Sequence, residues 1–210
     1  MRISCWSQPD PMRSALIWGL VAFVIGAPIV VAANSPLLQW REPLYIAAGL
    51  AGVVGMATML LQPLLVVGAL PGPSLTTSRR LHRYGGLVLV LAVALHVIGL
   101  WFTSPPDVID VLLLRSPTPF AIWGLLAMWA IFGAGVLALL RPRMPLRIWR
   151  WGHTGLVLLA AVGTVVHAVQ IVGTMGSVTK VMLSIALVAA LFLAIARRKV
   201  WMMGLRPRRN

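Results

Sequence analysis

Two apolar stretches decide the fold: LHRYGGLVLVLAVALH at positions 81–96 and GHTGLVLLAAVGTVVH at positions 152–167. They contain all four histidines of the chain, and in each stretch the two histidines are 14 residues apart: His82 and His96, then His153 and His167. On an α-helix, 14 residues make almost four turns and rise about 21 Å, so both imidazoles project from one face at two depths. Two such helices side by side would bring one histidine from each helix to both depths.

The composition places these stretches in a lipid bilayer. Hydrophobic residues make up 60% of the 210 positions and charged residues 10%, far from the balance of a soluble domain. Six apolar segments are long enough to cross a hydrocarbon core about 30 Å thick; they cover residues 15–33, 44–70, 81–102, 120–140, 151–172 and 178–196. Because these runs are continuously apolar rather than alternating, they indicate helices and not barrel strands. We therefore predict an all-α, polytopic membrane protein built as a six-transmembrane-helix bundle.

The net charge is +14, and the basic residues behind it are distributed as the positive-inside rule describes. If the N-terminus is cytoplasmic, fifteen basic residues lie on the inside, and the outer loops keep only Arg41, Arg115 and Lys180. This placement argues against nucleic acid as a partner. We expect a cytoplasmic N-tail (residues 1–14), a transmembrane domain (15–196) and a basic cytoplasmic C-tail (197–210), in the inner (plasma) membrane and in contact with its lipids.

The first apolar segment is interpreted as a retained helix and not as a cleaved secretory signal. Basic residues precede it and small residues follow it, as in a signal peptide. The apolar run is longer than the usual signal core, however, and Pro28 lies inside it.

The histidine pattern predicts two b-type haems. A titratable side chain within an apolar span usually serves an ion path, a proton relay or a cofactor, and a neutral imidazole can donate its lone pair to iron. Under the charge assignment both histidine helices run from the cytoplasm outward. His82 and His153 would therefore hold an inner haem iron, and His96 and His167 an outer one.

Two further expectations concern the surroundings of these ligands. The second ring nitrogen of each outer histidine is expected to bond a carbonyl one turn earlier in its own helix, near Ala92 for His96 and near Gly163 for His167. Cys5 is the only cysteine, which rules out an intramolecular disulfide and a cysteine-ligated iron–sulfur cluster within the chain.

The stretch Arg79-Arg80-Leu81-His82-Arg83-Tyr84-Gly85 followed by His96, and Arg150-Trp151-Gly152-His153 followed by His167, resemble the ferric reductase-like transmembrane domain. That domain is shared by ferric reductases, NADPH oxidases and the haem subunit of the periplasmic methionine sulfoxide reductase system. The resemblance covers essentially the whole chain. It implies six helices with two stacked b haems between the third and fifth, held by His82, His96, His153 and His167.

The resemblance also bears on partners. Ferric reductases and NADPH oxidases continue into a flavin and nicotinamide domain, whereas this sequence ends at Asn210, like the sulfoxide reductase subunit. We therefore expect a separate cytoplasmic flavin reductase or a quinol as electron donor, with FMN or quinone as a further cofactor, and an acceptor protein or ferric iron outside. Four arginines would pair with inner haem propionates or attract a flavin phosphate, or else act only as topogenic anchors: Arg79, Arg80, Arg83 and Arg150.

The leading hypothesis is a transmembrane electron wire, an oxidoreductase component that needs a separate reductase and has no catalytic residue of its own. The first alternative is a quinol-linked diheme cytochrome b that anchors a respiratory complex. The second is a non-redox transporter whose histidines relay protons. Three tryptophans near the membrane boundaries are expected to form an aromatic belt: Trp101, Trp149 and Trp151.

Overall fold

The computed structural model describes residues 10–198, and within this range the chain is helical and has no strand. Its α-helices are α1 (Pro11–Ala33), α2 (Pro43–Val66), α3 (Leu75–Thr103), α4 (Pro105–Leu112), α5 (Pro119–Leu140), α6 (Leu146–Gln170) and α7 (Ser177–Arg198). The 3-10 turns η1 (Pro36–Leu38) and η2 (Arg141–Arg143) lie in two of the connections. Six of these helices, all except the short α4, are long and apolar enough to span a membrane. The expected six-span, all-α architecture is confirmed.

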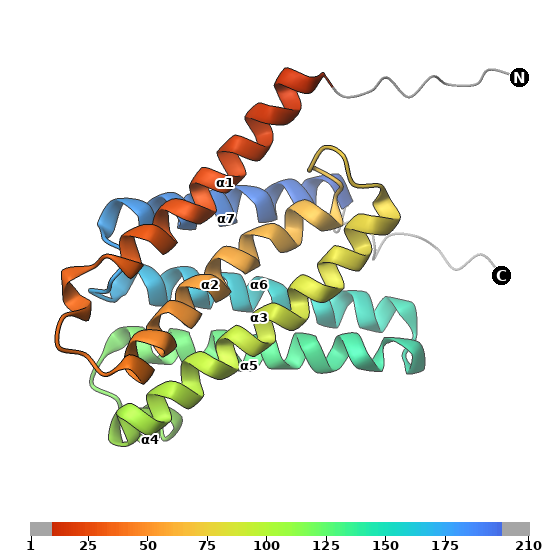
Figure 1. Ribbon diagram of the computed structural model, residues 1–210. Coiled ribbons are helices and arrows are strands. Elements are labelled where there is room, and N and C mark those ends of the chain that lie inside the picture. The colour runs from red at the N-terminus through yellow and green to blue at the C-terminus, as the bar shows by residue number, and fades with distance from the viewer. Residues whose placement is uncertain (1–9, 199–210) are drawn as a thin grey trace, which may run out of the picture.

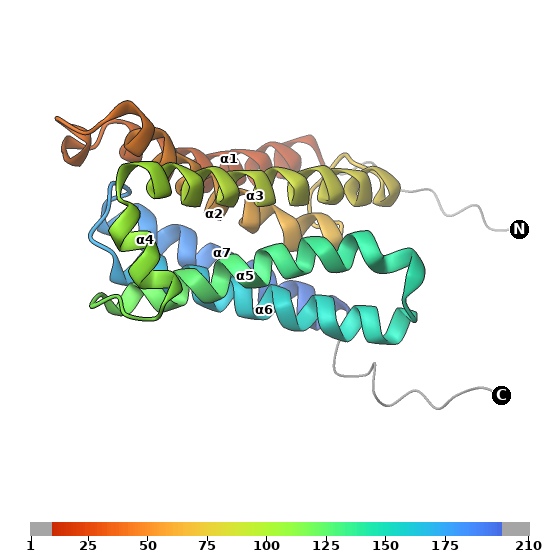
Figure 2. The ribbon, with the colours of Figure 1, turned by 90° about the horizontal axis from the view of Figure 1, so that it is seen from below.

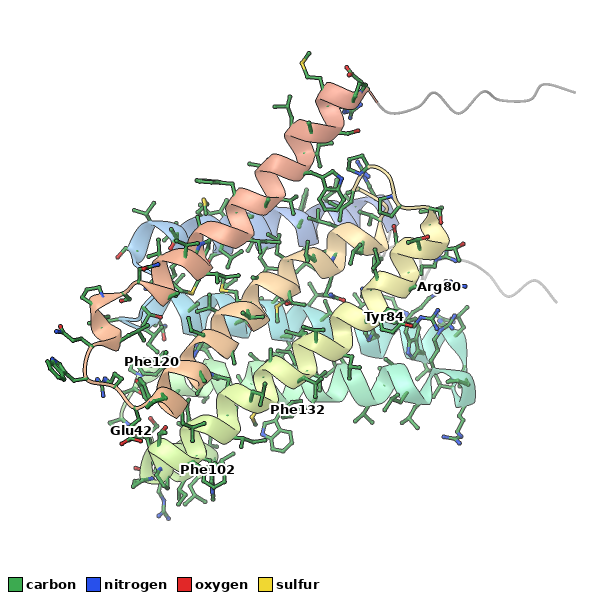
Figure 3. The ribbon with its side chains drawn as sticks, viewed as in Figure 1. Glu42, Arg80, Tyr84, Phe102, Phe120 and Phe132 are labelled. Atoms are coloured by element: carbon green, nitrogen blue, oxygen red, sulfur yellow. The ribbon has the colours of Figure 1, made fainter. Side chains whose placement is uncertain are left out.

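The connections gather at the two ends of the bundle (Figures 1 and 2). The start of α1, the α2–α3 and α5–α6 connections and the end of α7 lie together. We call this the basic end, after its arginines Arg13, Arg79, Arg80, Arg83, Arg141, Arg143, Arg147, Arg150 and Arg197. Figure 3 shows Arg80 at the basic end and Glu42, Phe102 and Phe120 at the opposite end. Most of the expected tails, residues 1–9 and 199–210, lie outside the described residues.

Capping residues explain why the two histidine helices begin earlier than expected. The Ser74 hydroxyl accepts a hydrogen bond from the Thr77 N–H, so α3 begins at Leu75 rather than at residue 81. Pro145 precedes α6, which begins at Leu146 rather than at residue 151. His82 and His153 therefore each lie seven residues inside a helix and not at its end.

The other departures from expectation lie in the connections. α2 ends at Val66 instead of continuing to residue 70, and Gly68 follows with a φ of 62°, a left-handed conformation that favours glycine. The amphipathic α4 was not predicted. Its eight residues fall in a connection whose apolar and acidic residues are too few to show helical periodicity reliably.

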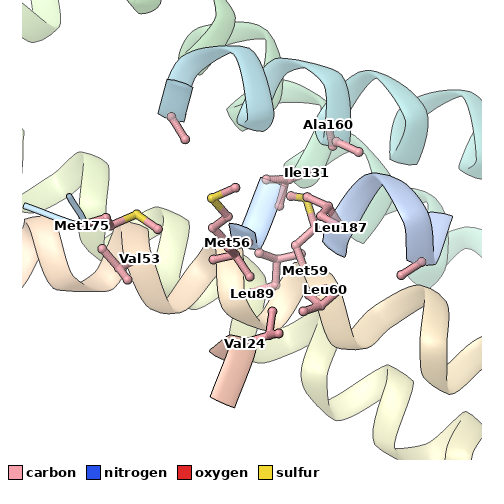
Figure 4. Packing of buried hydrophobic residues seen from close by; sticks show 14 of the residues in the cluster. Val24, Val53, Met56, Met59, Leu60, Leu89, Ile131, Ala160, Met175 and Leu187 are labelled. Carbon is pink, nitrogen blue, oxygen red and sulfur yellow. The ribbon is translucent and has the colours of Figure 1, made fainter. Parts of the chain in front are cut away.

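The bundle is arranged around the two hairpins α2–α3 and α5–α6, which lie as two layers in Figure 2. α3 packs on α5, while α7 packs on both α2 and α6 and so closes the other side. Leu183 and Leu187 of α7 are completely buried there. Figure 4 shows the apolar core at this junction, with Met56, Met59 and Leu89 packed against Ile131 and Leu187. The outward surface is apolar too, as lipid contact requires: Leu16 is 68% exposed and Phe192 73%.

Small residues set the distance between α5 and α6. A Cβ added at Gly163 would lie 2.8 Å from the Trp123 carbonyl oxygen and 3.1 Å from the Ala127 Cβ. Close approach through small residues is how helices associate in lipid, where hydrophobic burial supplies little.

We therefore predict that Gly163→Ala forces these helices apart and lowers the free energy of unfolding by about 1–3 kcal/mol. The measurement is unfolding by SDS titration in mixed micelles. The matched control is Gly155→Ala on the same helix, where an added Cβ meets nothing within 4 Å. Equal stability of the two variants would contradict the prediction.

Candidate functional site

The two outer histidines are held by backbone carbonyls of neighbouring helices. His96 Nδ1 lies 2.8 Å from the Ala48 oxygen of α2, and His167 Nδ1 lies 2.9 Å from the Phe120 oxygen of α5. The expectation that these nitrogens would bond their own helices, near Ala92 and Gly163, was wrong. Each ring instead points Nδ1 away from its own helix, toward a carbonyl of the neighbouring helix in the same hairpin.

A glycine opens the space for each ring. A Cβ at Gly52 would lie 2.9 Å from His96 Nδ1, and one at Gly124 would lie 2.7 Å from His167 Nδ1. Each glycine is one helical turn beyond the carbonyl that accepts the hydrogen bond, at Ala48 and Phe120 respectively. The imidazole therefore lies in a slot that any larger residue at the glycine position would fill.

This arrangement occurs twice along the chain. Positions 48, 52, 82 and 96 of the first hairpin recur at positions 120, 124, 153 and 167 of the second, 71 or 72 residues later. In each hairpin the first helix supplies a carbonyl and a glycine, and the second supplies two histidines. The signal that sequence reasoning missed is this common offset, which relates the helices before the histidines as well as the histidines themselves.

The hydrogen bonds fix which ring nitrogen carries the proton. A carbonyl oxygen only accepts, so Nδ1 of His96 and of His167 must donate. In a neutral imidazole the other nitrogen, Nε2, then keeps its lone pair and is available as a metal ligand.

The two inner histidines face each other across the hairpins. The ring centroids of His82 and His153 are 6.5 Å apart, with an angle of 80° between the ring planes. All four histidines are half-buried. The structure therefore brings the inner pair together, one histidine from α3 and one from α6. The outer pair comes from the same two helices, and each of its rings is bonded to the preceding helix of its own hairpin.

Buried polar atoms flank His82. Ser78, one turn before it on α3, is 1% exposed, and its Oγ has no hydrogen-bond partner among residues 10–198. The Oε1 of Gln62 on α2 is also buried and unpartnered in that range, and this side chain lies against Gly85, less than one turn after His82. Unpaired polar atoms are costly in an apolar interior. Their position suits contact with a polar group bound beside His82.

The four arginines singled out from the sequence lie at the basic end, all exposed: Arg79, Arg80, Arg83 and Arg150. Arg79 and Arg150 occupy matching positions, each three residues before an inner histidine. All four lie within three residues of an inner histidine in sequence and at least 13 residues from an outer one.

Trp149 makes a contact that the sequence did not predict. Its indole is stacked on the His153 imidazole, with centroids 5.1 Å apart and an interplanar angle of 10°. The expected aromatic-belt position therefore also brings it into contact with an inner histidine. Periodicity alone does not distinguish a tryptophan that faces lipid from one that faces the next turn of its own helix.

Two further features of residues 10–198 concern metal-ligating side chains and an apolar groove. No group of three or more His, Cys, Asp or Glu that could hold a metal ion occurs within residues 10–198. An apolar groove of about 740 Å³ lies between α1, α2 and α7, but it is lined by residues such as Ile17, Leu60 and Met182 and includes no histidine.

Comparison with known proteins gives one match. Residues 48–164, more than half of the chain, match the family model described as "Ferric reductase like transmembrane component". The match begins at Ala48, includes His82, His96 and His153, and ends three residues before His167. No curated protein and no solved structure matches the chain.

The slot geometry predicts that Gly124→Ala displaces the His167 ring, because the added Cβ and Nδ1 cannot occupy the same space. We expect a changed ¹⁵N chemical shift at His167 Nδ1, an unchanged one at His96, and a loss of about 1–3 kcal/mol in stability. Gly49→Ala, where an added Cβ meets nothing within 4 Å, is the control. An unaltered His167 signal in Gly124→Ala would refute the slot.

Proposed function

Because the chain belongs to the ferric reductase-like transmembrane family, we propose that it carries electrons across the membrane through two b-type haems. His82 and His153 would hold the inner haem iron, and His96 and His167 the outer one. The observation that carries this proposal is the close approach of His82 of α3 and His153 of α6, whose ring centroids are 6.5 Å apart.

The inner pair has the separation that shared ligation requires. Two imidazoles that bind one metal ion through nitrogens at about 2 Å place their ring centroids roughly 6 Å apart. The observed separation of 6.5 Å agrees with this value. The unpartnered Ser78 and Gln62 oxygen atoms beside His82 are suitable neighbours for a polar edge of the group.

The outer pair supports the proposal through its hydrogen bonds. Metal-bound histidines usually donate their second ring N–H to a carbonyl or carboxylate, which orients the ring and strengthens the metal bond. His96 and His167 both do so, to Ala48 and Phe120. Their Nε2 atoms are left to bind iron.

A bound b haem supplies reversible one-electron chemistry at iron, and two histidines per iron leave no open position for substrate. The protein's own residues then hold and insulate the path. The apolar helices exclude water, the histidines fix the two depths about 21 Å apart along each helix, and Arg79 and Arg150 offset propionate charge at the inner level. With the basic end cytoplasmic, both chain ends are cytoplasmic and electrons leave the inner membrane on its outer side.

The positions of the acids argue against a proton-relay transporter. The four carboxylate side chains, Asp10, Glu42, Asp107 and Asp110, all lie at helix starts or in connections. Intramembrane proton paths usually run through chains of Asp, Glu and His. Here the Nδ1–H of each outer histidine donates to a backbone carbonyl and not to a carboxylate. That nitrogen therefore has no acidic partner to which it could pass a proton.

We favour a separate flavin reductase over a quinol as the electron donor. The groove between α1, α2 and α7 is lined by apolar side chains, so it offers a quinol headgroup no hydrogen-bond partner. The arginines at the basic end would attract an anionic flavin phosphate. The acceptor is ferric iron or a partner reductase outside the membrane.

We predict that the purified protein binds two haems and shows b-type absorption in reduced-minus-oxidised spectra. His96→Ala and His167→Ala should each lose about half the haem, and His82→Ala and His153→Ala the other half, since one missing axial ligand removes one of two sites. Pyridine haemochrome titration measures the haem content. Two haems retained by every single variant would mean that the pairing is wrong.

We also predict that a flavin reductase with nicotinamide cofactor reduces both haems faster than a quinol analogue does, because the inner site lies beneath the basic end. Stopped-flow absorbance in detergent micelles measures the two rates. Arg79→Ala together with Arg150→Ala should slow the flavin-dependent rate at low salt, with Arg115→Ala at the opposite end as control. Faster reduction by quinol would favour the respiratory-anchor function instead.

A further inference from the structure

The four histidines are not oriented in the same way. Outer His96 and His167 each donate a well-formed hydrogen bond to a carbonyl. Inner His153 faces the backbone of Ala134, but its Nδ1 forms no hydrogen bond of ordinary geometry. A metal ligand without such a bond needs another constraint, because rotation of the ring weakens and redirects the bond to the metal.

Trp149 supplies this constraint. Its indole is stacked on the His153 ring one turn away, nearly parallel at 10° and with centroids 5.1 Å apart. Contact with a flat aromatic face restricts rotation of the imidazole about its Cβ–Cγ bond, because turning the ring would break the stacking.

The indole is itself held in place by two groups at the end of α5. Its Nε1–H donates to the Leu137 oxygen at 3.0 Å. That carbonyl is free for this bond because the Arg141 N–H turns back to Ala138 instead, which leaves one of the unsatisfied carbonyls found at every helix C-terminus. The Arg141 guanidinium lies over the indole ring, 5.3 Å from its centroid, as in a cation–π contact.

From these contacts, and resting on the function proposed above, we propose that Trp149 is the positioning residue of the inner haem. It fixes the plane of the His153 imidazole and couples that plane to the C-terminus of α5. The matching position on α3, 71 residues earlier, is Ser78. The two inner ligands are therefore held by different neighbours, so loss of Trp149 affects one inner ligand and leaves both outer ones intact.

The test uses the full-length, haem-loaded protein with Trp149 replaced by Leu, Met or Phe. Leucine and methionine remove the flat face, methionine with less loss of volume, and phenylalanine keeps an aromatic face. Trp151→Leu is the matched control, because Trp151 lies two residues further along α6 and is 47% exposed. The readouts are the low-spin ferric EPR signals and the rate at which each haem transfers to apomyoglobin. His167→Ala, which lacks the outer haem, identifies the inner signal.

We expect Trp149→Leu and Trp149→Met to shift the g values of the inner signal alone and to speed loss of the inner haem about 10-fold or more, as for other lost ligand-orienting partners. Trp149→Phe and the control Trp151→Leu should both keep g values and a rate of inner-haem loss close to those of the wild type. The ratio of inner to outer signal is read within each sample, so a poor yield does not obscure the result.

The inference is overturned if Trp149→Leu and Trp149→Met leave the inner signal unchanged, if they alter both haems equally, or if Trp151→Leu has the same effect. In each of these cases the wild type still holds two haems and the proposed function stands. A wild type without haem overturns both proposals.

Discussion

The structure depends on backbone carbonyls that accept hydrogen bonds from intramembrane histidines. In lipid there is no water to satisfy an imidazole N–H, so a ring at mid-bundle depth needs a fixed protein acceptor. The Ala48 and Phe120 oxygen atoms meet this need. Each already accepts a backbone bond within its own helix and uses its second lone pair for the histidine. The positions of α2 against α3 and of α5 against α6 follow from this contact, because the glycine one turn further on sets how closely the ring approaches.

The same solution is used twice, and it extends to helix packing. Small residues meet where α2 crosses α3 and where α5 crosses α6: Gly99 lies against Ala48 in one hairpin, and Gly163 against Ala127 in the other. The glycine is thus on the second helix of each hairpin, where an added Cβ would lie 2.6 Å from the Ala48 Cβ in the first and 3.1 Å from the Ala127 Cβ in the second. One Cβ fits at each of these crossings and two would crowd it, which lets the helices of each hairpin approach closely.

The sequence predicts the features that arise from local patterns and misses those that only tertiary contacts decide. Six spans, their helical character and the pairing of histidines were all expected, because hydropathy and a 14-residue spacing are local patterns. The acceptors for His96 and His167 were wrong, since an Ala or Phe carbonyl looks like any other in sequence and only tertiary contact selects it. The stacking of Trp149 on His153 was not predicted, because it too depends on side-chain packing that the sequence pattern does not show. The starts of α3 and α6 were missed because polar and basic residues, which hydropathy excludes from a span, extend both helices beyond the apolar run.

The arginines at the basic end bear on two properties, the orientation of the bundle in the membrane and the electrostatics of the inner histidine pair. As topogenic charges they fix which way the bundle crosses the membrane. Under the proposed function, their positive field beside His82 and His153 would also stabilise an extra electron there, which would raise the potential of the inner site and oppose onward transfer. Haem propionates, two on each group, would offset this field where Arg79 and Arg150 lie three residues before the inner histidines. The opposite end has Glu42, Asp107 and Asp110 against Arg41, Arg115 and Lys180, so its field is close to neutral. Under that function, the balance between propionates and arginines at the inner level would decide whether outward electron flow is downhill.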